Sequence, residues 1–233
     1  GREPMPPHNL TYTAVGAAML WVGWLGFNGG STPACEGLAP SVLAATHLSA
    51  AAGCVTWASI EWWRRRQPTV LGACTGMVAG LVCITPAAGF VSPVAALVFG
   101  VAAGGVCYYA CTTLKSRGGY DDSLDAFGVH GVGGTLGAIL TGVFATRACW
   151  NIDNGRPLGL IEGQGRVLLG QTAAVLVTLV VVGLLLWLVN SYIPMEGRIK
   201  QILNIVVIIL VVLWLLSVFG VFSGVPRIYL GNR

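Results

Sequence analysis

Long apolar runs, separated by short polar segments, dominate this sequence. The runs are continuous rather than alternating and are too long for barrel strands, and most reach the ~20 residues that a helix needs to cross a bilayer. We therefore predict an all-α fold, a polytopic integral membrane helical bundle of about seven transmembrane helices, in which the third helix is short. The predicted spans are 10–28, 40–61, 69–86, 92–114, 126–145, 167–189 and 200–222.

Composition narrows the class of protein further. Hydrophobic residues make up 55% of the chain and charged residues 9%, whereas a soluble domain carries roughly 25% charged residues. This deficit excludes a soluble enzyme, and no nucleophile–base pair or metal-ligand set predicts a membrane enzyme, a metal site or a cofactor. The net charge of +4 is too modest to indicate nucleic-acid binding.

Residue usage also differs between the two ends of the chain. The 33 glycines, together with many alanines, predict helices whose backbones approach closely, as is usual for helices that pack in lipid. Residues 1–166 carry most of this Gly/Ala texture and form the expected inner bundle. From residue 167 onward the spans are nearly pure Leu, Ile and Val, which is typical of peripheral helices that face lipid.

The charges in the short loops predict an orientation. One set of loops, with the N-terminal segment, holds eight Lys and Arg, and the other set holds five. Because positive residues favour the cytoplasmic side, we predict a plasma or inner membrane protein with its N-terminus in the cytoplasm and its C-terminus outside. The eight residues are Arg2, Arg64, Arg65, Arg66, Lys115, Arg117, Arg198 and Lys200.

His130 is an ionisable residue a few positions inside the fifth predicted span, in "FGVHGVGGTLGAI". Such residues are costly in a membrane and commonly mark a transport path or a proton relay. Gly133 and Gly137 form a small-xxx-small pair that allows another helix to pack closely. The pattern leaves two interpretations open, a functional imidazole or a structural histidine that is hydrogen-bonded to its neighbours.

Three carboxylates precede that histidine, in "DDSLD". Acidic side chains at a helix N-terminus accept hydrogen bonds from free backbone N–H groups and interact favourably with the helix dipole. We interpret Asp121, Asp122 and Asp125 as capping and ion-pairing groups that anchor the helix below His130.

The segment "WVGWLGFNGGS" places Trp21, Trp24 and Phe27 on one predicted helix face, and Asn28 and Ser31 at the predicted outer surface. This pattern fits an interfacial aromatic belt or a recruitment site for a small cation, since aromatic faces attract cations within about 6 Å. We interpret His47, on an Ala/Ser face of the second span, as a packed and hydrogen-bonded structural histidine.

A second aromatic and basic pattern follows at the end of the second span. In "EWWRRR", two tryptophans precede three arginines. Trp residues are enriched at headgroup level and Arg residues on the cytoplasmic side. We interpret residues 61–66 as an interfacial anchor.

Three blocks of the sequence, in this order and spacing, resemble the ammonium transporter (Amt/Mep/Rh) family. The resemblance covers about residues 5–190, and the third block is long and highly specific. The blocks are "PHNLTYTAVGAAMLWVGWLGFNGGS" (7–31), "PTVLGACTGMVAGLVCITPAAGFVSPVAALVFGVAAG" (68–104) and "DDSLDAFGVHGVGGTLGAILTGVFA" (121–145).

The resemblance implies a trimeric, channel-like transporter of eleven helices, in which ammonium is recruited at an outer site, loses a proton and crosses a hydrophobic pore past two facing histidines. By position, His130 resembles the second pore histidine and Phe27 one of the gating phenylalanines. Trp24 lies on the corresponding pore-lining helix, and Ser31 resembles the serine of the outer recruitment site.

The remaining matches imply structural roles. Asp122 and Asp125 resemble the structural acids that precede the histidine helix, and His47 falls where family members often carry a "TH" pair, with no transport role. Residues 1–192 are thus expected to form six transmembrane helices, the C-terminal half of the family fold. Residues 193–233 are expected to add a single transmembrane helix with a short outward tail, for which we recognise no family.

The resemblance begins at the sixth helix of the family, so the first pore histidine and part of the outer site have no counterpart. We expect a partial or split ammonium transporter that conducts ammonium/ammonia when a complementary membrane subunit or a homo-oligomer completes it. The alternative is a non-transporting accessory or structural subunit of a larger membrane complex, derived from an ammonium transporter. The extra span favours the alternative, whereas intact His130, Phe27 and Ser31 favour transport.

Overall fold

The computed structural model describes residues 6–32, 38–149, 158–192, 205–206 and 209. These residues form helices and turns, and no strand occurs among them. The predicted all-α class is confirmed. The predicted seventh span, 200–222, and the predicted boundary between residues 192 and 193 lie almost entirely outside the described residues.

Ten helical segments follow one another along the described chain. Pro93–Gly118 is one continuous rod that contains a π-helical segment, and Phe127–Phe144 is a second rod that begins with one. The segments are α1 (Leu10–Gly30), α2 (Leu38–Arg65), α3 (Val70–Ile84), α4 (Pro93–Tyr109), the π-helical turn η1 (Ala110–Leu114), α5 (Lys115–Gly118), the π-helical turn η2 (Phe127–Gly131), α6 (Val132–Phe144), the 3₁₀ turn η3 (Leu160–Glu162) and α7 (Arg166–Tyr192).

Five of these helical stretches are long and apolar enough to cross a membrane: α1, α2, Pro93–Gly118, Phe127–Phe144 and most of α7. The helix α3 has 15 residues, which matches the short third span predicted from the sequence. Together with α3, they reproduce the first six predicted spans. The end residues differ by a few positions because polar groups at the helix ends, rather than hydropathy alone, set the boundaries.

Side-chain caps explain where three of the helices begin. The Asn9 side chain accepts a hydrogen bond from the Tyr12 amide at the start of α1, and the Thr69 hydroxyl accepts one from Gly72 N at the start of α3. Ser92 does the same for α4, whose first residue is Pro93. Each cap satisfies one of the N–H groups that a helix start leaves unpaired.

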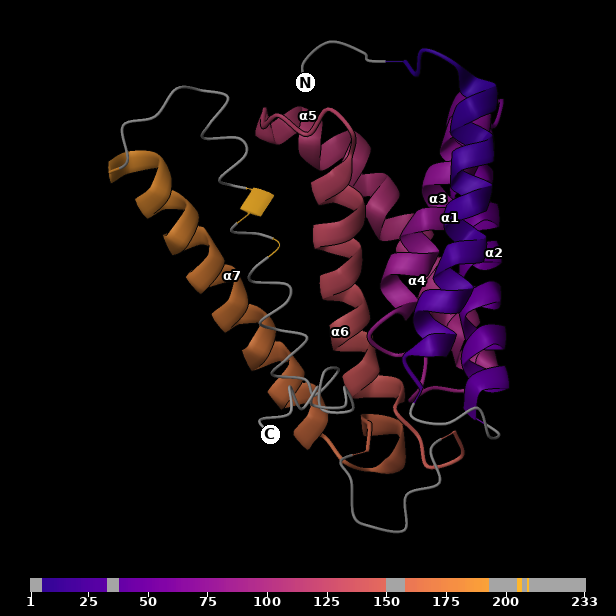
Figure 1. Cartoon of the computed structure of the whole chain (residues 1–233), viewed down its shortest axis with the longest axis vertical. Coiled ribbons are helices and arrows are strands. Elements are labelled where there is room, and N and C mark those ends of the chain that lie inside the picture. Colours follow the sequence, from indigo (N-terminus) through magenta and orange to yellow (C-terminus); the bar gives the residue numbers. More distant parts are fainter. Residues whose placement is uncertain (1–5, 33–37, 150–157, 193–204, 207–208, 210–233) are drawn as a thin grey trace, which may run out of the picture. The chain divides into compact units, whose positions relative to one another are not determined.

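The first compact unit, Gly1–Thr172, contains the bundle that positions the site. Its successive long helices run in alternating directions (Figure 1), and α2 makes its most extensive contacts with α3 and α4. Glycines permit this close approach: a side chain on Gly80 or Gly100 would overlap the backbone carbonyl of Ser49. The Ser49 hydroxyl donates to the Gly80 carbonyl at 2.8 Å, which ties α2 to α3.

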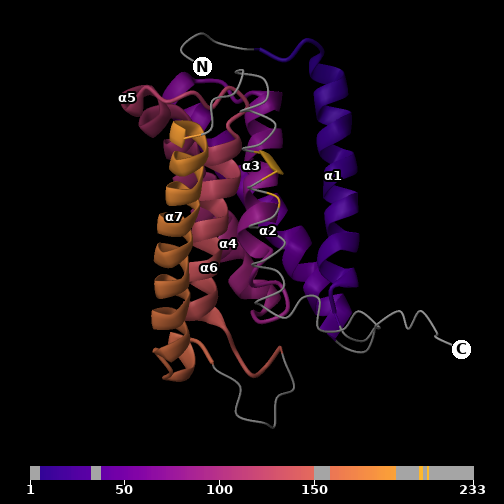
Figure 2. The same cartoon turned by 60° about the vertical axis from the view of Figure 1, so that its left-hand side comes forward.

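The helix α1 lies at the edge of this bundle, beside α2 and α3 (Figure 2). Only Ala17 and Asn28 of its 21 residues are buried. Most of α1 therefore presents an open face, which is unlike the core helices α3 and α4.

The second compact unit begins at Ala173, within α7. Most of its described part is the apolar remainder of that helix, rich in Leu and Val. None of the α7 residues whose side chains are described is buried. That this helix faces lipid stays a prediction from its sequence.

Candidate functional site

Trp24 and His130 form an aromatic pair between α1 and η2. Their ring centroids lie 6.5 Å apart with an interplanar angle of 26°. Trp24 is half-buried, and its Nε1 donates to the Thr85 hydroxyl at 2.8 Å. Thr85 in turn donates to the Leu81 carbonyl at 2.8 Å. The indole is therefore held from the end of α3 while its ring lies against the imidazole.

The rest of the predicted aromatic site follows on the last turns of α1. The Phe27 ring meets the Trp24 ring edge-on, at 6.3 Å and 65°, and the Phe27 side chain is 56% exposed. Ser31, the C-cap of α1, is exposed, and its hydroxyl donates to the Phe27 carbonyl at 2.7 Å. Because this bond uses the hydroxyl hydrogen, the Ser31 oxygen still has lone pairs that can accept a hydrogen bond from a cation.

His130 lies within the π-helical turn η2, which opens its helix. Such π-helical turns are rare and occur frequently at functional sites. Asp122, only 8% exposed, accepts hydrogen bonds from Phe127 N at 3.1 Å and Gly128 N at 3.0 Å. One buried carboxylate thus satisfies two backbone donors in the first turn of the helix that carries the histidine.

Asp125 ties the same turn to the preceding rod. Its carboxylate receives the Lys115 ammonium at 2.7 Å in a partly exposed ion pair. Its backbone adopts φ of 55°, in the left-handed region that Asp tolerates better than most residues. Asp121 has a different place: it is exposed and accepts a hydrogen bond from the Ser123 hydroxyl.

Tyr120 packs the loop before the His130 helix against the first residue of that helix. Its ring meets the Phe127 ring edge-on at 5.8 Å. Burial first, and the negative charge of Asp122 next, raise the pKa of the Tyr120 phenol above its usual value.

Glycines near His130 let the helix Phe127–Phe144 pack closely against its neighbouring helices. A side chain on Gly128 would overlap Sγ of Cys111, and one on Gly137 would overlap the carbonyl of Cys83. Gly133 also lies against α3 and α4, next to Cys107 Sγ. The close approach predicted from Gly133 and Gly137 is confirmed, and Cys111 is a contact that the sequence did not reveal.

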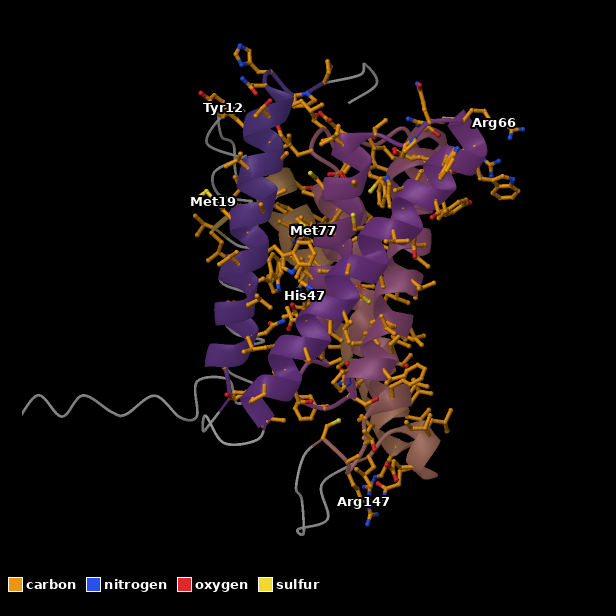
Figure 3. All side chains as sticks on the ribbon, turned by 90° about the vertical axis from the view of Figure 1, so that its right-hand side faces the viewer. Tyr12, Met19, His47, Arg66, Met77 and Arg147 are labelled. Carbon is orange, nitrogen blue, oxygen red and sulfur yellow. The ribbon has the colours of Figure 1, made fainter. Side chains whose placement is uncertain are left out.

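A second tryptophan–histidine pair lies between α1 and α2. Trp21 stacks on His47 with centroids 5.0 Å apart and an angle of 30°. The imidazole of His47 is exposed and makes no hydrogen bond with any described residue, so the structure shows a stacking contact in place of the expected hydrogen bond, and the structural role of His47 stays a prediction. Figure 3 shows His47 on α2, facing the space beside α1.

The predicted common face of the aromatic residues also divides in the structure. Trp21 belongs to the His47 pair, and Trp24 with Phe27 to the His130 pair, because residues three apart on a helix are rotated by about 60°. Asn28 is buried rather than at the surface, and it donates to the Thr46 hydroxyl at 3.1 Å. A polar contact of this kind fixes the lower part of α1 on α2.

The open face of α1 forms a shallow apolar groove beside the site. The groove has a volume of about 510 Å³, and a side chain on Gly16 or Gly23 would meet nothing within 4 Å. His130 is itself exposed at the surface of the described chain. The groove is lined by Gly16, Met19, Leu20, Gly23, Trp24 and Phe27.

The arrangement brings hydrogen-bonding groups and aromatic faces together. Within the described part of the chain, no group of three or more His, Cys, Asp and Glu side chains could hold a metal ion. An imidazole carries one donor and one acceptor nitrogen when neutral, and the neighbouring indole and phenyl faces attract cations. Thr85 and Cys111 complete the set of supporting residues, and only tertiary packing brings them to it.

Comparison with known proteins shows which family the chain resembles. The model described as Ammonium Transporter Family matches residues 1–200. The ammonium transporter of Bacillus subtilis (strain 168) is 44% identical over 195 residues, which cover 82% of this chain and 48% of that protein. A putative ammonium transporter of Methanothermobacter thermautotrophicus is 42% identical, over 74% of this chain and 42% of that protein.

Solved structures give the same relationship. The crystal structure of Saccharomyces cerevisiae Mep2 superposes with a TM-score of 0.70 and 39% identity, over 81% of this chain and 46% of that one. The chain spans about half the length of the curated relatives it matches.

Proposed function

The chain belongs to the ammonium transporter family and is an integral membrane protein, and from this premise we propose that its first unit supplies one half of a hydrophobic, histidine-lined pore for ammonium and ammonia. The stacked Trp24–His130 pair carries the proposal. Helices equivalent to the remaining half of its relatives complete the pore, in a trimer-like assembly. They cover the open face of α1 and enclose His130.

The chemistry of the substrate explains why an imidazole suits this position. Ammonium and potassium ions have similar size and charge, so a selective pore must use the N–H groups that potassium lacks. A neutral imidazole can accept a hydrogen bond or a proton from such a group. The apolar surroundings of a membrane pore make a bare cation costly, so a species that can lose a proton passes more readily.

The residues of α1 fit the binding of ammonium that precedes proton transfer to His130. The Ser31 oxygen and the exposed Phe27 face lie at the C-terminal end of α1, where a cation can be held by a hydrogen bond and by the ring face. Trp24 continues this path to His130. In the predicted orientation, with the N-terminus in the cytoplasm, Ser31 lies on the outer side.

Uptake of methylammonium by proteoliposomes tests the proposal. The chain is reconstituted together with the complementary helices, and His130→Ala is compared with His8→Ala, an exposed histidine outside the membrane spans. We expect His130→Ala to lower uptake about tenfold, because the substrate loses one hydrogen bond to a desolvated group. We expect His8→Ala to leave uptake within about twofold, as for a surface substitution away from the site.

Two results would count against the proposal in different ways. Unchanged uptake in His130→Ala would remove His130 from the mechanism. Absence of uptake in the unsubstituted assembly, with normal expression and folding, would favour the alternative of a non-transporting subunit of a membrane complex.

A further inference from the structure

The end of α2 carries an aromatic and basic segment that the proposed pore does not use. Trp62 and Trp63 are 65% and 79% exposed, and Arg64, Arg65 and Arg66 are exposed as well. We call residues 62–66 the basic aromatic segment. It places two large apolar surfaces and three positive charges on five consecutive residues at the end of a membrane-spanning helix.

The adjacent acidic residue does not neutralise these arginines. Glu61 is buried, and its carboxylate accepts hydrogen bonds from Thr69 N at 2.8 Å and the Thr69 hydroxyl at 2.9 Å. Among the described residues, no ion pair engages any of the three guanidinium groups. The positive charge of the segment is therefore available to a partner.

The local backbone fixes the segment at the end of the helix. Arg66 adopts φ of 63°, and its amide donates to the Trp62 carbonyl at 2.9 Å. The Arg64 guanidinium lies 5.8 Å from the centroid of the Tyr108 ring, which keeps it close to the bundle. Arg65 and Arg66 have no such contact among the described residues.

The described residues at the opposite end of the bundle lack this run of exposed tryptophans and consecutive arginines. Figure 3 shows Arg66 and Arg147 at opposite ends. At the Arg147 end, Glu162 accepts hydrogen bonds from the Thr146 hydroxyl and from the backbone amide of Arg147, so its carboxylate is engaged locally, as that of Glu61 is. The Arg147 end therefore supplies exposed arginines that, among the described residues, do not follow a pair of exposed tryptophans.

We propose that the basic aromatic segment binds the headgroup of an anionic phospholipid in the membrane leaflet at its end of the bundle. Tryptophan rings favour the headgroup region, and guanidinium groups bind phosphate oxygens through two parallel hydrogen bonds. Because Trp62 and Trp63 lie directly beside the arginines on a membrane-spanning helix, the arginines are held at headgroup depth. An acidic soluble protein would not explain the paired tryptophans.

Native mass spectrometry of the full chain tests this proposal without reference to transport. The chain is purified in a neutral detergent with equal amounts of phosphatidylglycerol and phosphatidylcholine, and the retained lipids are counted. We expect the unsubstituted chain to retain mainly phosphatidylglycerol. Because each arginine near an anionic surface contributes about 1 kcal/mol, Arg65→Gln with Arg66→Gln should lower this preference roughly thirtyfold.

The matched control removes two charges at the other end. Arg147→Gln with Arg166→Gln changes the net charge equally at two exposed residues and should alter the preference by less than about twofold, since exposed charges at this distance are screened. An equal loss in both double variants would show a general charge effect and overturn the proposal. Equal retention of both lipids by the unsubstituted chain would overturn it as well. All four positions are exposed, and an unchanged thermal unfolding curve verifies that each variant folds.

Discussion

Two tryptophan–histidine pairs lie along the same helix, and they are held in different ways. Trp21 and His47 are the closer pair, with centroids 5.0 Å apart, against 6.5 Å for Trp24 and His130. The wider pair nevertheless has the polar restraints: Thr85 accepts from the Trp24 indole. In the closer pair, the Trp21 Nε1 is buried and has no hydrogen-bond partner among the described residues.

The difference extends to the histidines. His130 lies in a π-helical turn whose first N–H groups bind Asp122, whereas His47 lies inside the regular helix α2. The two pairs therefore differ in how firmly their rings are positioned, not only in the distance between them. A ring held by hydrogen bonds and a capped helix start has a defined position, and defined positions are what selective binding of a small molecule requires.

The largest effect in this comparison is expected from Asp122→Ala. The substitution leaves Phe127 N and Gly128 N without an acceptor at a buried helix start, so the free energy of unfolding should fall by about 2–3 kcal/mol. Thermal unfolding in a defined detergent measures the change. Asp121→Ala is the matched control, since Asp121 is exposed and binds Ser123. Equal losses in both variants would mean that loop charge, not the cap, supports His130.

An intermediate effect is expected from Thr85→Val, which keeps the side-chain shape but removes the acceptor of the Trp24 indole. The free energy of unfolding should fall by about 1–2 kcal/mol. The chain offers a close control in Thr75→Val, because Thr75 makes the same bond to the carbonyl four residues earlier but holds no indole. If the two variants unfold alike, the tether of Trp24 contributes nothing.

The smallest effect is expected from Trp21→Phe. This change weakens the stack on His47 by about 0.5–1.5 kcal/mol but removes a buried indole N–H that has no described partner, a group that costs about 1–3 kcal/mol. The free energy of unfolding should change by about 0.5 kcal/mol or less, while Trp24→Phe should lower it by about 1 kcal/mol. A larger loss for Trp21→Phe than for Trp24→Phe would reverse the comparison between the pairs.

Much of the fold could be predicted from hydropathy. The first six predicted spans correspond to helices of the structure, and even the short α3 was expected. A segment of this kind that crosses a bilayer must be helical, because each of its backbone N–H and C=O groups must be hydrogen-bonded within the segment. Two local features could also be expected: the capping of the His130 helix by Asp122, and the close helix packing at Gly133 and Gly137. Both depend on residues that are close together in the sequence.

The site could be predicted only in part. His130, Trp24, Phe27 and Ser31 were predicted as site residues from their types and by resemblance, but the residues that hold them in place were not. Thr85 lies 61 residues from Trp24 along the chain, and no local pattern links the two. The assignment of Trp21 to His47, and the exposure of that imidazole, were likewise not evident from a helix face alone.

The sequence by itself determined the helices, their order and the chemistry available on each, because hydropathy and capping act over a few neighbouring residues. The tertiary structure decided which histidine is restrained, which tryptophan is hydrogen-bonded and which face of α1 stays open. These features depend on how closely glycine-lined helices approach one another, and that distance is set by residues far apart in the chain.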